Sequence, residues 1–223
     1  MSPLGLLKRV FQGMADRFVY FFDVLKRREM TKKYRKPDPF GRLPFTGDID
    51  AAVSLLPNVR YSVCLEVGTG LGLYAERVAP LCDRVIAIDI CRSAIRRARK
   101  RLHEVPNIVF QTRNIRRLTG ASGRFDLIIL GDVLYNLGDL EFPDRFQEVV
   151  DRIVSFLAPG GRILVSHHIS PDRQESDILA YTMAFERRGL TVERSHRFNN
   201  GLIDVVQAVL RAPQPRRSSD IPR

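Results

Sequence analysis

The stretch that decides the fold is Leu65-Glu66-Val67-Gly68-Thr69-Gly70-Leu71-Gly72, which leads directly into an amphipathic segment that begins at Leu73. Alternating apolar residues over 63–67 predict a short buried strand, and the later period predicts a helix that Pro80 limits. The three glycines allow a turn where the backbone takes unusual dihedral angles and a ligand approaches closely. Because a helix N-terminus directs N–H groups at such a turn, the stretch predicts a nucleotide-binding loop.

The spacing of the glycines distinguishes between nucleotides. A dinucleotide fingerprint, G-x-G-x-x-G, that started at Gly68 would place its third glycine at position 73, which is Leu73. This departure disfavours an NAD-linked oxidoreductase. Glu66, two residues before the first glycine, would repel a pyrophosphate and suits a ligand with a cationic end.

Strand-like and helix-like segments alternate along most of the chain. The predicted strands cover 62–67, 84–89, 107–111, 125–130, 162–167, 190–197 and 202–210, and the predicted helices cover 49–56, 73–79, 93–102, 143–157 and 176–188. This alternation predicts an α/β fold with a doubly wound, mostly parallel seven-stranded sheet. The run Phe198-Asn199-Asn200-Gly201 predicts that the last two strands form an antiparallel C-terminal hairpin.

Two basic segments flank the predicted domain, which spans 45–211. Residues 1–44 are expected to hold a basic amphipathic helix over 4–30 and a basic linker at 32–36, and residues 212–223 a disordered basic tail. In one interpretation, the N-terminal helix packs on its own domain or on a second subunit. In the other it lies over the active site or makes weak contact with a membrane surface.

The composition bounds the function. The chain has 36 Lys and Arg against 25 Asp and Glu, a net charge of +11 that invites a nucleic-acid or membrane partner. We favour a solvated basic surface, because no aromatic residues are interleaved among the arginines of 92–101. Three cysteines without a C-x-x-C pair suggest neither disulfides nor structural zinc, and a reduced cytoplasmic compartment is expected. The sequence predicts no metal site and no membrane span.

A second acid marks the end of the next predicted strand. Asp89 lies 23 residues after Glu66, close to the offset at which a strand-end carboxylate binds ribose hydroxyls in nucleotide-binding folds. A carboxylate that accepts from two hydroxyl groups makes charge-assisted hydrogen bonds. Asp89 is therefore predicted to bind the ribose of a nucleoside ligand.

Four segments together resemble the class I S-adenosylmethionine (SAM) dependent methyltransferases over about residues 45–210. They are the glycine stretch, Ala87-Ile88-Asp89-Ile90, Phe125-Asp126-Leu127-Ile128-Ile129 and Leu157-Ala158-Pro159-Gly160-Gly161. Within this class the chain is similar to the nodulation protein S family. That likeness is carried by Asp132-Val133-Leu134-Tyr135, Asp38-Pro39-Phe40 and Arg60-Tyr61.

The resemblance implies SAM as cofactor. The implied binding residues are Glu66, Gly68, Thr69, Gly70, Gly72, Asp89, Ile90, Asn114, Ile115 and Gly131. Glu66 would favour the methionine ammonium and Asp89 the ribose. Asn114 stands where such enzymes usually have an acid that binds the adenine amino group. The chain departs from the family at three places. The family tends to have Cys where this chain has Thr69, Trp where it has Phe40, and a Val-His-Trp-like run where it has Ser166-His167-His168.

The acceptor site is expected beyond the carboxyl ends of the strands. This nominates Asp132, Tyr135, His167 and His168 as catalytic residues. A histidine is the better base near neutral pH, although both histidines can equally be structural. Tyr135 would orient the acceptor, stack on the cofactor or pack in the core, and Asp132 would pair with an acceptor amine.

The resemblance implies N-methylation of an amino sugar in a chitin-like oligosaccharide, and more broadly a small-molecule or oligosaccharide acceptor bearing an amine or hydroxyl. A nucleic-acid methyltransferase is the first alternative. It is disfavoured because the loop after the fourth strand lacks the Asp/Asn-Pro-Pro-aromatic run that grips a base. A non-catalytic SAM-fold binding protein is the second alternative. The sequence leaves the oligomeric state open.

Overall fold

The computed structural model describes residues 27–36, 38–39, 46–137, 143–170 and 175–214. Most of the predicted N-terminal helix and of the predicted tail lie outside these residues. Within them, 27–33 are helical. No helix in the described ranges is long and apolar enough to cross a membrane.

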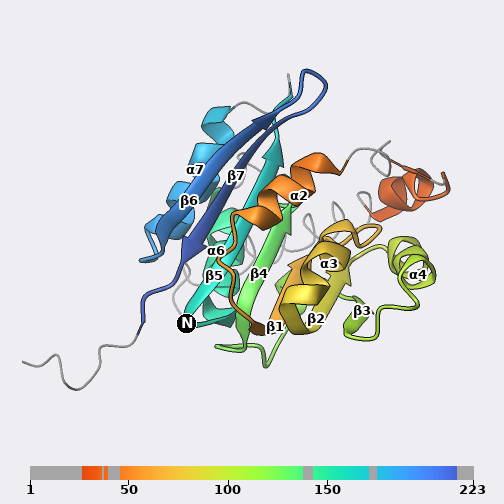
Figure 1. The fold of residues 1–223 in the computed structure, drawn as a ribbon, viewed down its shortest axis with the longest axis horizontal. Helices are drawn as coiled ribbons and strands as arrows, with labels where there is room; N and C mark the ends of the chain where they lie inside the picture. Colours follow the sequence, from red (N-terminus) through yellow and green to blue (C-terminus); the bar gives the residue numbers. More distant parts are fainter. Residues whose placement is uncertain (1–26, 37, 40–45, 138–142, 171–174, 215–223) are drawn as a thin grey trace, which may run out of the picture.

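The core of the molecule is a seven-stranded sheet with the order β3-β2-β1-β4-β5-β7-β6 (Figure 1). The neighbouring pairs among β1 to β5 are parallel, and β7 runs antiparallel to both β5 and β6. The predicted doubly wound sheet with a C-terminal hairpin is therefore confirmed. The strands are β1 (Tyr61–Val67), β2 (Cys82–Asp89), β3 (Ile108–Thr112), β4 (Phe125–Gly131), β5 (Leu157–His168), β6 (Thr191–Asn199) and β7 (Asp204–Arg211).

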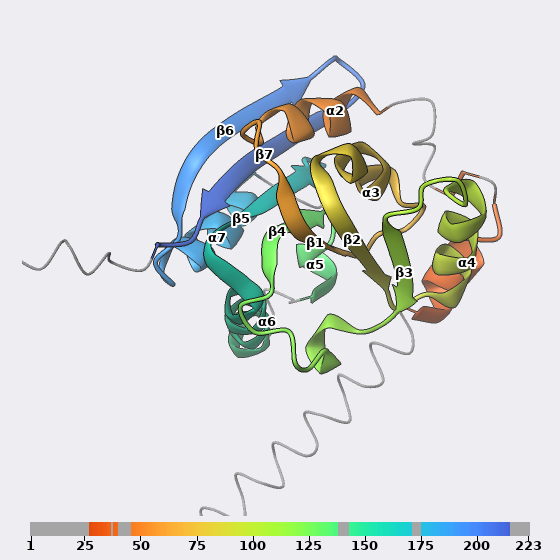
Figure 2. The same ribbon diagram turned by 60° about the horizontal axis from the view of Figure 1, so that its bottom comes forward.

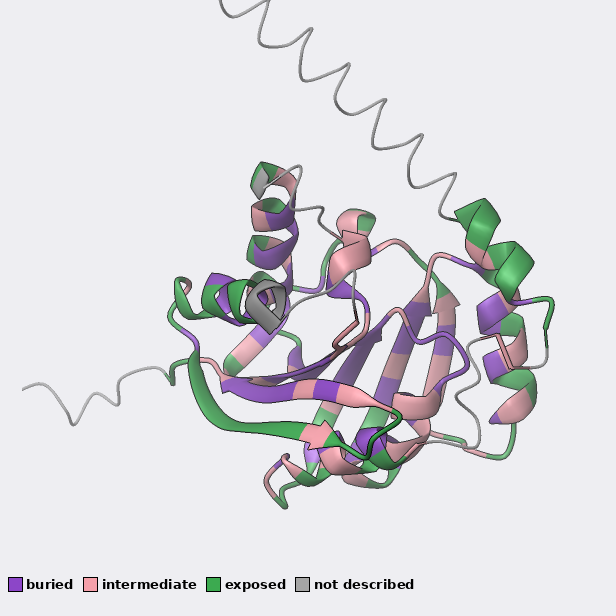
Figure 3. Ribbon diagram, turned by 90° about the horizontal axis from the view of Figure 1, so that it is seen from above, coloured by how far each residue is buried: buried purple, intermediate pink, exposed green. Residues whose placement is uncertain are grey.

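Helices cover both faces of the sheet (Figure 2). Because side chains alternate along a strand, Leu65 of β1 packs with α6 and α7, whereas Cys64 packs with α2, α3 and α4. Figure 3 shows the edge strand β6 exposed and its neighbour β7 largely buried. The helices are α2 (Gly47–Ser54), α3 (Leu73–Val78), α4 (Arg92–Arg101), α5 (Leu134–Leu137), α6 (Pro143–Phe156) and α7 (Glu175–Glu186), with 3₁₀ turns η1 (Ala79–Leu81) and η2 (Ile115–Arg117).

Two turns differ from the sequence prediction. The Pro-Gly-Gly turn at 159–161 lies within β5, where the register against β4 shifts between Phe125 and Leu127. The hairpin turn lies at 200–203 rather than 198–201, because Asn200 Oδ1 accepts from the backbone N–H of Leu202 and of Ile203 at 3.1 and 2.9 Å. The side chain of Asn200 thus replaces the two-residue Asn-Gly turn.

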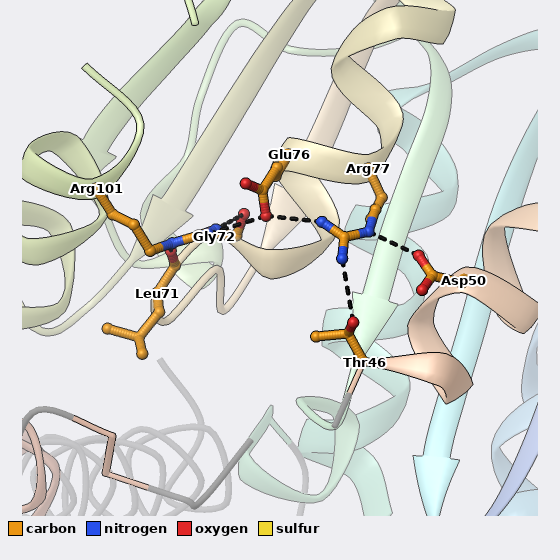
Figure 4. Close-up of polar contacts among 7 residues, drawn as sticks. All are labelled: Thr46, Asp50, Leu71, Gly72, Glu76, Arg77 and Arg101. Carbon is orange, nitrogen blue, oxygen red and sulfur yellow. Dashed lines mark hydrogen bonds and ion pairs between the residues drawn. The ribbon is translucent and has the colours of Figure 1, made fainter. Parts of the chain in front are cut away.

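The arginines of α4 were expected to form a solvated face, which is wrong for Arg101. Its guanidinium donates to the carbonyl oxygens of Leu71 and Gly72, each at 3.0 Å, and to Glu76 Oε2 at 2.9 Å (Figure 4). The rigid fork of five N–H donors suits this arrangement. Arg101 therefore fastens the glycine loop to the end of α4.

Arg77 extends this network to α2. It donates to Glu76 Oε2 at 2.8 Å, to Asp50 Oδ1 at 2.6 Å and to Thr46 Oγ1 at 3.1 Å (Figure 4). Glu76 thus accepts from two guanidinium groups. The network joins α2, α3 and α4 across one side of the glycine loop.

We predict that Arg101→Gln lowers the free energy of unfolding by about 1–2 kcal/mol, because it removes three hydrogen bonds made by a charged group that is partly exposed. Urea unfolding measures the change. Lys100→Gln, on the exposed face one residue away, is the control and is expected to stay within about 0.5 kcal/mol of the parent. Equal unfolding midpoints for the two variants would contradict the assigned role.

Candidate functional site

The predicted site residues gather at one edge of the sheet, because β1, β2, β4 and β5 all end there. The order of the strands reverses between β1 and β4, which is where ligands bind in open α/β sheets. The loops after these two strands are in contact. A Cβ atom added at Gly68 would lie 2.5 Å from Val133 Cγ2.

The glycine loop is held against the end of β2. The backbone N–H groups of Gly68 and Thr69 both donate to the carbonyl oxygen of Ile88, at 2.8 and 3.0 Å. Gly70 has a φ of +55°, which a side chain would strain. The backbone conformation that the sequence predicted is thus present.

Asp89 joins the loops after β1 and β2. Its Oδ2 accepts from the Gly70 N–H at 3.0 Å, and its Oδ1 accepts from the Cys91 N–H at 2.7 Å. Burial raises the pKa of Asp89 against the lowering effect of these two N–H groups. Each carboxylate oxygen keeps a second lone pair, so two ribose hydroxyls remain acceptable partners.

Glu66 is buried beneath the loop. Its Oε2 accepts from Thr69 Oγ1 at 2.7 Å, and the backbone N–H of Ala75 also donates to it. Burial raises the pKa of Glu66 to about 8, although these donors act in the opposite direction. An approaching ammonium group would favour the ionised carboxylate.

The other residues predicted to bind the cofactor, of which Asn114 was expected near the adenine, differ in their surroundings. Asn114 caps η2, and its Oδ1 accepts from the Arg116 N–H at 3.0 Å. The side chain of Ile115 is buried in the core, so any contact of Ile115 with the cofactor would come from its backbone. Gly131 packs against Tyr74, since an added Cβ would lie 2.4 Å from Cε2 of that ring. Ile90 follows Asp89 and is partly buried.

Asp132 pairs with His168 at the ends of β4 and β5. Its Oδ1 accepts from the His168 backbone N–H at 2.9 Å, and its Oδ2 contacts His168 Nδ1. Burial would raise the pKa of Asp132, but the hydrogen bonds and charge of His168 outweigh it and hold the pKa below its ordinary value. Among the described residues Asp132 alone combines a side chain with positive φ, at +48°. Such strain is typical of functional sites.

Sequence reasoning missed a second carboxylate beside His168. Asp48 Oδ2 of α2 lies 3.7 Å from His168 Nε2, and Asp48 is 1% exposed. The side chain of Gln207 on β7 donates to the Asp48 carbonyl oxygen at 2.6 Å, which fixes the start of α2 over the sheet. His168 therefore lies between two carboxylates.

The two histidines occupy different environments. His167 is 2% exposed, and its ring lies 6.3 Å from Tyr135 and 5.4 Å from Tyr181 between centroids. Its Nδ1 is 3.9 Å from Asp132 Oδ1. His168, with 23% of its side chain exposed, is the more accessible of the two. Of the two predicted bases, the geometry favours His168.

A further aromatic residue reaches the loop. Tyr34, placed by the sequence in a basic linker, is 5% exposed, and a Cβ at Gly70 would lie 2.6 Å from its hydroxyl oxygen. The only sequence signal that could have identified Tyr34 was that it is an aromatic residue among basic ones.

The rest of the described chain shows no second group of candidate functional residues. No cluster of three or more His, Cys, Asp or Glu in the described residues could hold a metal ion. A groove of about 750 Å³ between α6 and the 116–122 segment contains none of the predicted site residues.

The chain resembles nodulation proteins in sequence. It is 34% identical to nodulation protein S of Rhizobium tropici over 100 residues, which are 45% of this chain and 40% of that protein. It is 37% identical to the Bradyrhizobium diazoefficiens protein over 95 residues, 43% of this chain and 44% of that one. The matched stretch thus spans less than half the length of these relatives.

Solved structures share the fold. The N-methyltransferase NodS from Bradyrhizobium japonicum WM9, in complex with S-adenosylhomocysteine, superposes with a TM-score of 0.70 at 25% identity, covering 84% of this chain and 98% of that one. A Burkholderia thailandensis 1,6-didemethyltoxoflavin-N1-methyltransferase superposes with a TM-score of 0.71 at 17% identity, over 87% and 90%. The second match speaks for the fold alone.

The model of the family described as nodulation protein S (NodS) matches residues 55–170, which is more than half of the chain and includes most of the predicted site residues. This match agrees with the resemblance that the sequence motifs carried. The chain belongs to the nodulation protein S family.

Proposed function

We propose that this protein is a SAM-dependent N-methyltransferase whose acceptor is an amine on a small molecule or oligosaccharide, with an amino sugar as the leading candidate. The observation that carries the proposal is the placement of two groups at one sheet edge. The glycine loop with Asp89 and Glu66 forms one, and Asp132, His168 and Asp48 form the other. The related NodS from Bradyrhizobium japonicum is an N-methyltransferase solved with S-adenosylhomocysteine.

The residues present fit such a cofactor. Gly68 and Gly70 both have positive φ, and a Cβ at either position would lie within 2.6 Å of a neighbouring atom, so the backbone at these two positions stays free of side chains. The buried carboxyl of Glu66 suits an ammonium, and Asp89 suits ribose hydroxyls. When bound, SAM supplies a methyl group on a sulfonium, which is transferred in line to a lone pair of the acceptor.

The acceptor amine must lose a proton to present that lone pair. Asp132 accepts at His168 Nδ1, which fixes the tautomer and leaves Nε2 as the basic atom. Asp48 Oδ2 at 3.7 Å is beyond hydrogen-bond distance, yet its charge stabilises the imidazolium that forms. His168 is therefore the proposed general base, with Asp132 and Asp48 as positioning residues.

The nucleic-acid alternative loses part of its motivation. Arg97 donates to the carbonyl oxygens of Tyr34 and Lys36, and Arg101 donates to the glycine loop. These guanidinium groups of α4 serve the fold, so the basic patch available for phosphates is smaller than the sequence suggested.

We expect Asp89→Asn to weaken SAM and S-adenosylhomocysteine binding by about 10- to 100-fold, since it removes a charged acceptor. Calorimetry beside NAD measures this change. Asp83→Asn, on the same strand but exposed at its opposite end, is the matched control and is expected to bind as the parent does. Undiminished binding by Asp89→Asn would remove the cofactor assignment. SAM binding without methyl transfer to any amine would instead support the non-catalytic alternative.

The raised pKa of Glu66 predicts a pH dependence. Below about pH 8 the carboxyl is mostly protonated in the free protein, and an ammonium ligand favours its ionised form, so binding releases a proton. SAM affinity should therefore rise with pH, by about five- to tenfold per unit between about pH 6 and pH 7.5. Calorimetry in buffers of different ionisation enthalpy detects the released proton. In Glu66→Gln the slope should disappear, and an unchanged slope would refute the assignment.

His168→Gln is expected to reduce kcat by about 100- to 10 000-fold while leaving S-adenosylhomocysteine affinity unchanged. The assay uses de-N-acetylated chitooligosaccharides as acceptors. His196→Gln, exposed on β6, is the control. Full activity in His168→Gln would rule out this base.

A further inference from the structure

The segment before the matched domain is docked beside α4. The described helical residues 27–33 lie next to α4 in Figures 2 and 3, and Thr31 Oγ1 is 3.5 Å from Cys91 Sγ. Met30 packs against a buried cluster at the N-terminus of α4 and the glycine loop, which consists of Tyr34, Leu71, Cys91 and Ala94. The family match begins only at residue 55, so this segment lies outside it.

The backbone around Tyr34 is fixed as well. Arg97 donates to the Tyr34 carbonyl oxygen at 2.8 Å and also to that of Lys36. The Tyr34 N–H donates to the Met30 carbonyl oxygen at 2.9 Å. Hydrogen bonds at both the N–H and the carbonyl oxygen of Tyr34 thus fix the backbone from which the ring projects.

The hydroxyl of Tyr34 reaches the loop where the cofactor is proposed. A Cβ on Gly70 would lie 2.6 Å from the hydroxyl oxygen, and the ring is almost completely buried. Burial, followed by the charges of Asp89 and other neighbours including Glu66, raises the pKa of Tyr34. The phenol therefore stays protonated and can donate a hydrogen bond.

The loop itself has few donors for an anionic group. The N–H groups of Gly68 and Thr69 bind Ile88, and that of Gly70 binds Asp89. Glu66 and Asp89 would repel a carboxylate. A methionine moiety carries both an ammonium and a carboxylate. Beside this loop the carboxylate therefore needs an uncharged hydrogen-bond donor.

We propose that the Tyr34 hydroxyl binds the methionine carboxylate of the cofactor, so that the N-terminal segment completes a site otherwise built by the matched domain. This inference rests on the proposed function and deepens it. It assigns the two charged ends of the methionine moiety to different residues, the ammonium to Glu66 and the carboxylate to Tyr34.

Calorimetry on the full chain tests this with three ligands. Tyr34→Phe should weaken S-adenosylhomocysteine by about 10- to 100-fold, as expected for a hydrogen bond to a charged group. It should leave decarboxylated S-adenosylmethionine and 5′-methylthioadenosine unchanged, because both lack the carboxylate. Met30→Leu, in the same packing cluster, is the control and should bind all three ligands as the parent does. Thermal unfolding verifies that each variant is folded.

The outcomes separate this inference from the proposed function. Equal losses for all three ligands would show that Tyr34 only shapes the pocket, and no loss would show that it lies outside the site; either result overturns the inference. If the parent protein binds none of the ligands, the proposed function fails and this inference fails with it. If the parent binds the ligands and Tyr34→Phe binds them equally well, the proposed function stands but Tyr34 has no part in it.

Discussion

The carboxylate of Asp89 is the contact on which the arrangement of the site depends. It accepts from Gly70 in the loop after β1 and from Cys91 at the start of α4, so it joins the connections that follow two neighbouring strands. Withdrawing a carboxylate from water costs free energy unless donors replace the water, and here two backbone N–H groups do so. Arg101 holds the same loop from the other end of α4. The loop conformation is therefore determined by β2 and by both ends of one helix.

The parts of the site that the sequence predicted are those set by local chain geometry. A strand, a glycine turn and a helix are consecutive, and parallel strands bring their carboxyl ends to one edge, so Glu66, Gly70 and Asp89 could be placed together before the structure was known. Turn details were less predictable. Asn200 accepts from two backbone N–H groups in a way that competes with the Asn-Gly turn, and a side chain of this kind has several local partners of similar energy.

The residues that the sequence did not predict reach the site through tertiary packing. Asp48 sits at the start of α2, and its position depends on Gln207 from a strand near the other end of the chain. Tyr34 lies among basic residues that are typical of a linker, and its burial depends on α4 and the glycine loop. No periodicity or spacing connects such residues to the site. The same holds for the contacts that Arg97 and Arg101 make with backbone carbonyl groups, because such partners carry no sequence signal.

The carboxyl groups of the site show how its two halves differ. Burial dominates at Glu66 and Asp89 and raises the pKa of each, because their partners are neutral hydroxyl or N–H groups. Asp132 is only partly buried, and the neighbouring His168 lowers its pKa against the effect of that burial. One half thus holds carboxyl groups that gain from an added cation, and the other holds a carboxylate already matched by an imidazole. A cationic cofactor requires carboxyl groups that can take up its charge, and an acceptor that must lose a proton requires a base. The two groups of residues that meet these requirements lie side by side at one edge of the sheet.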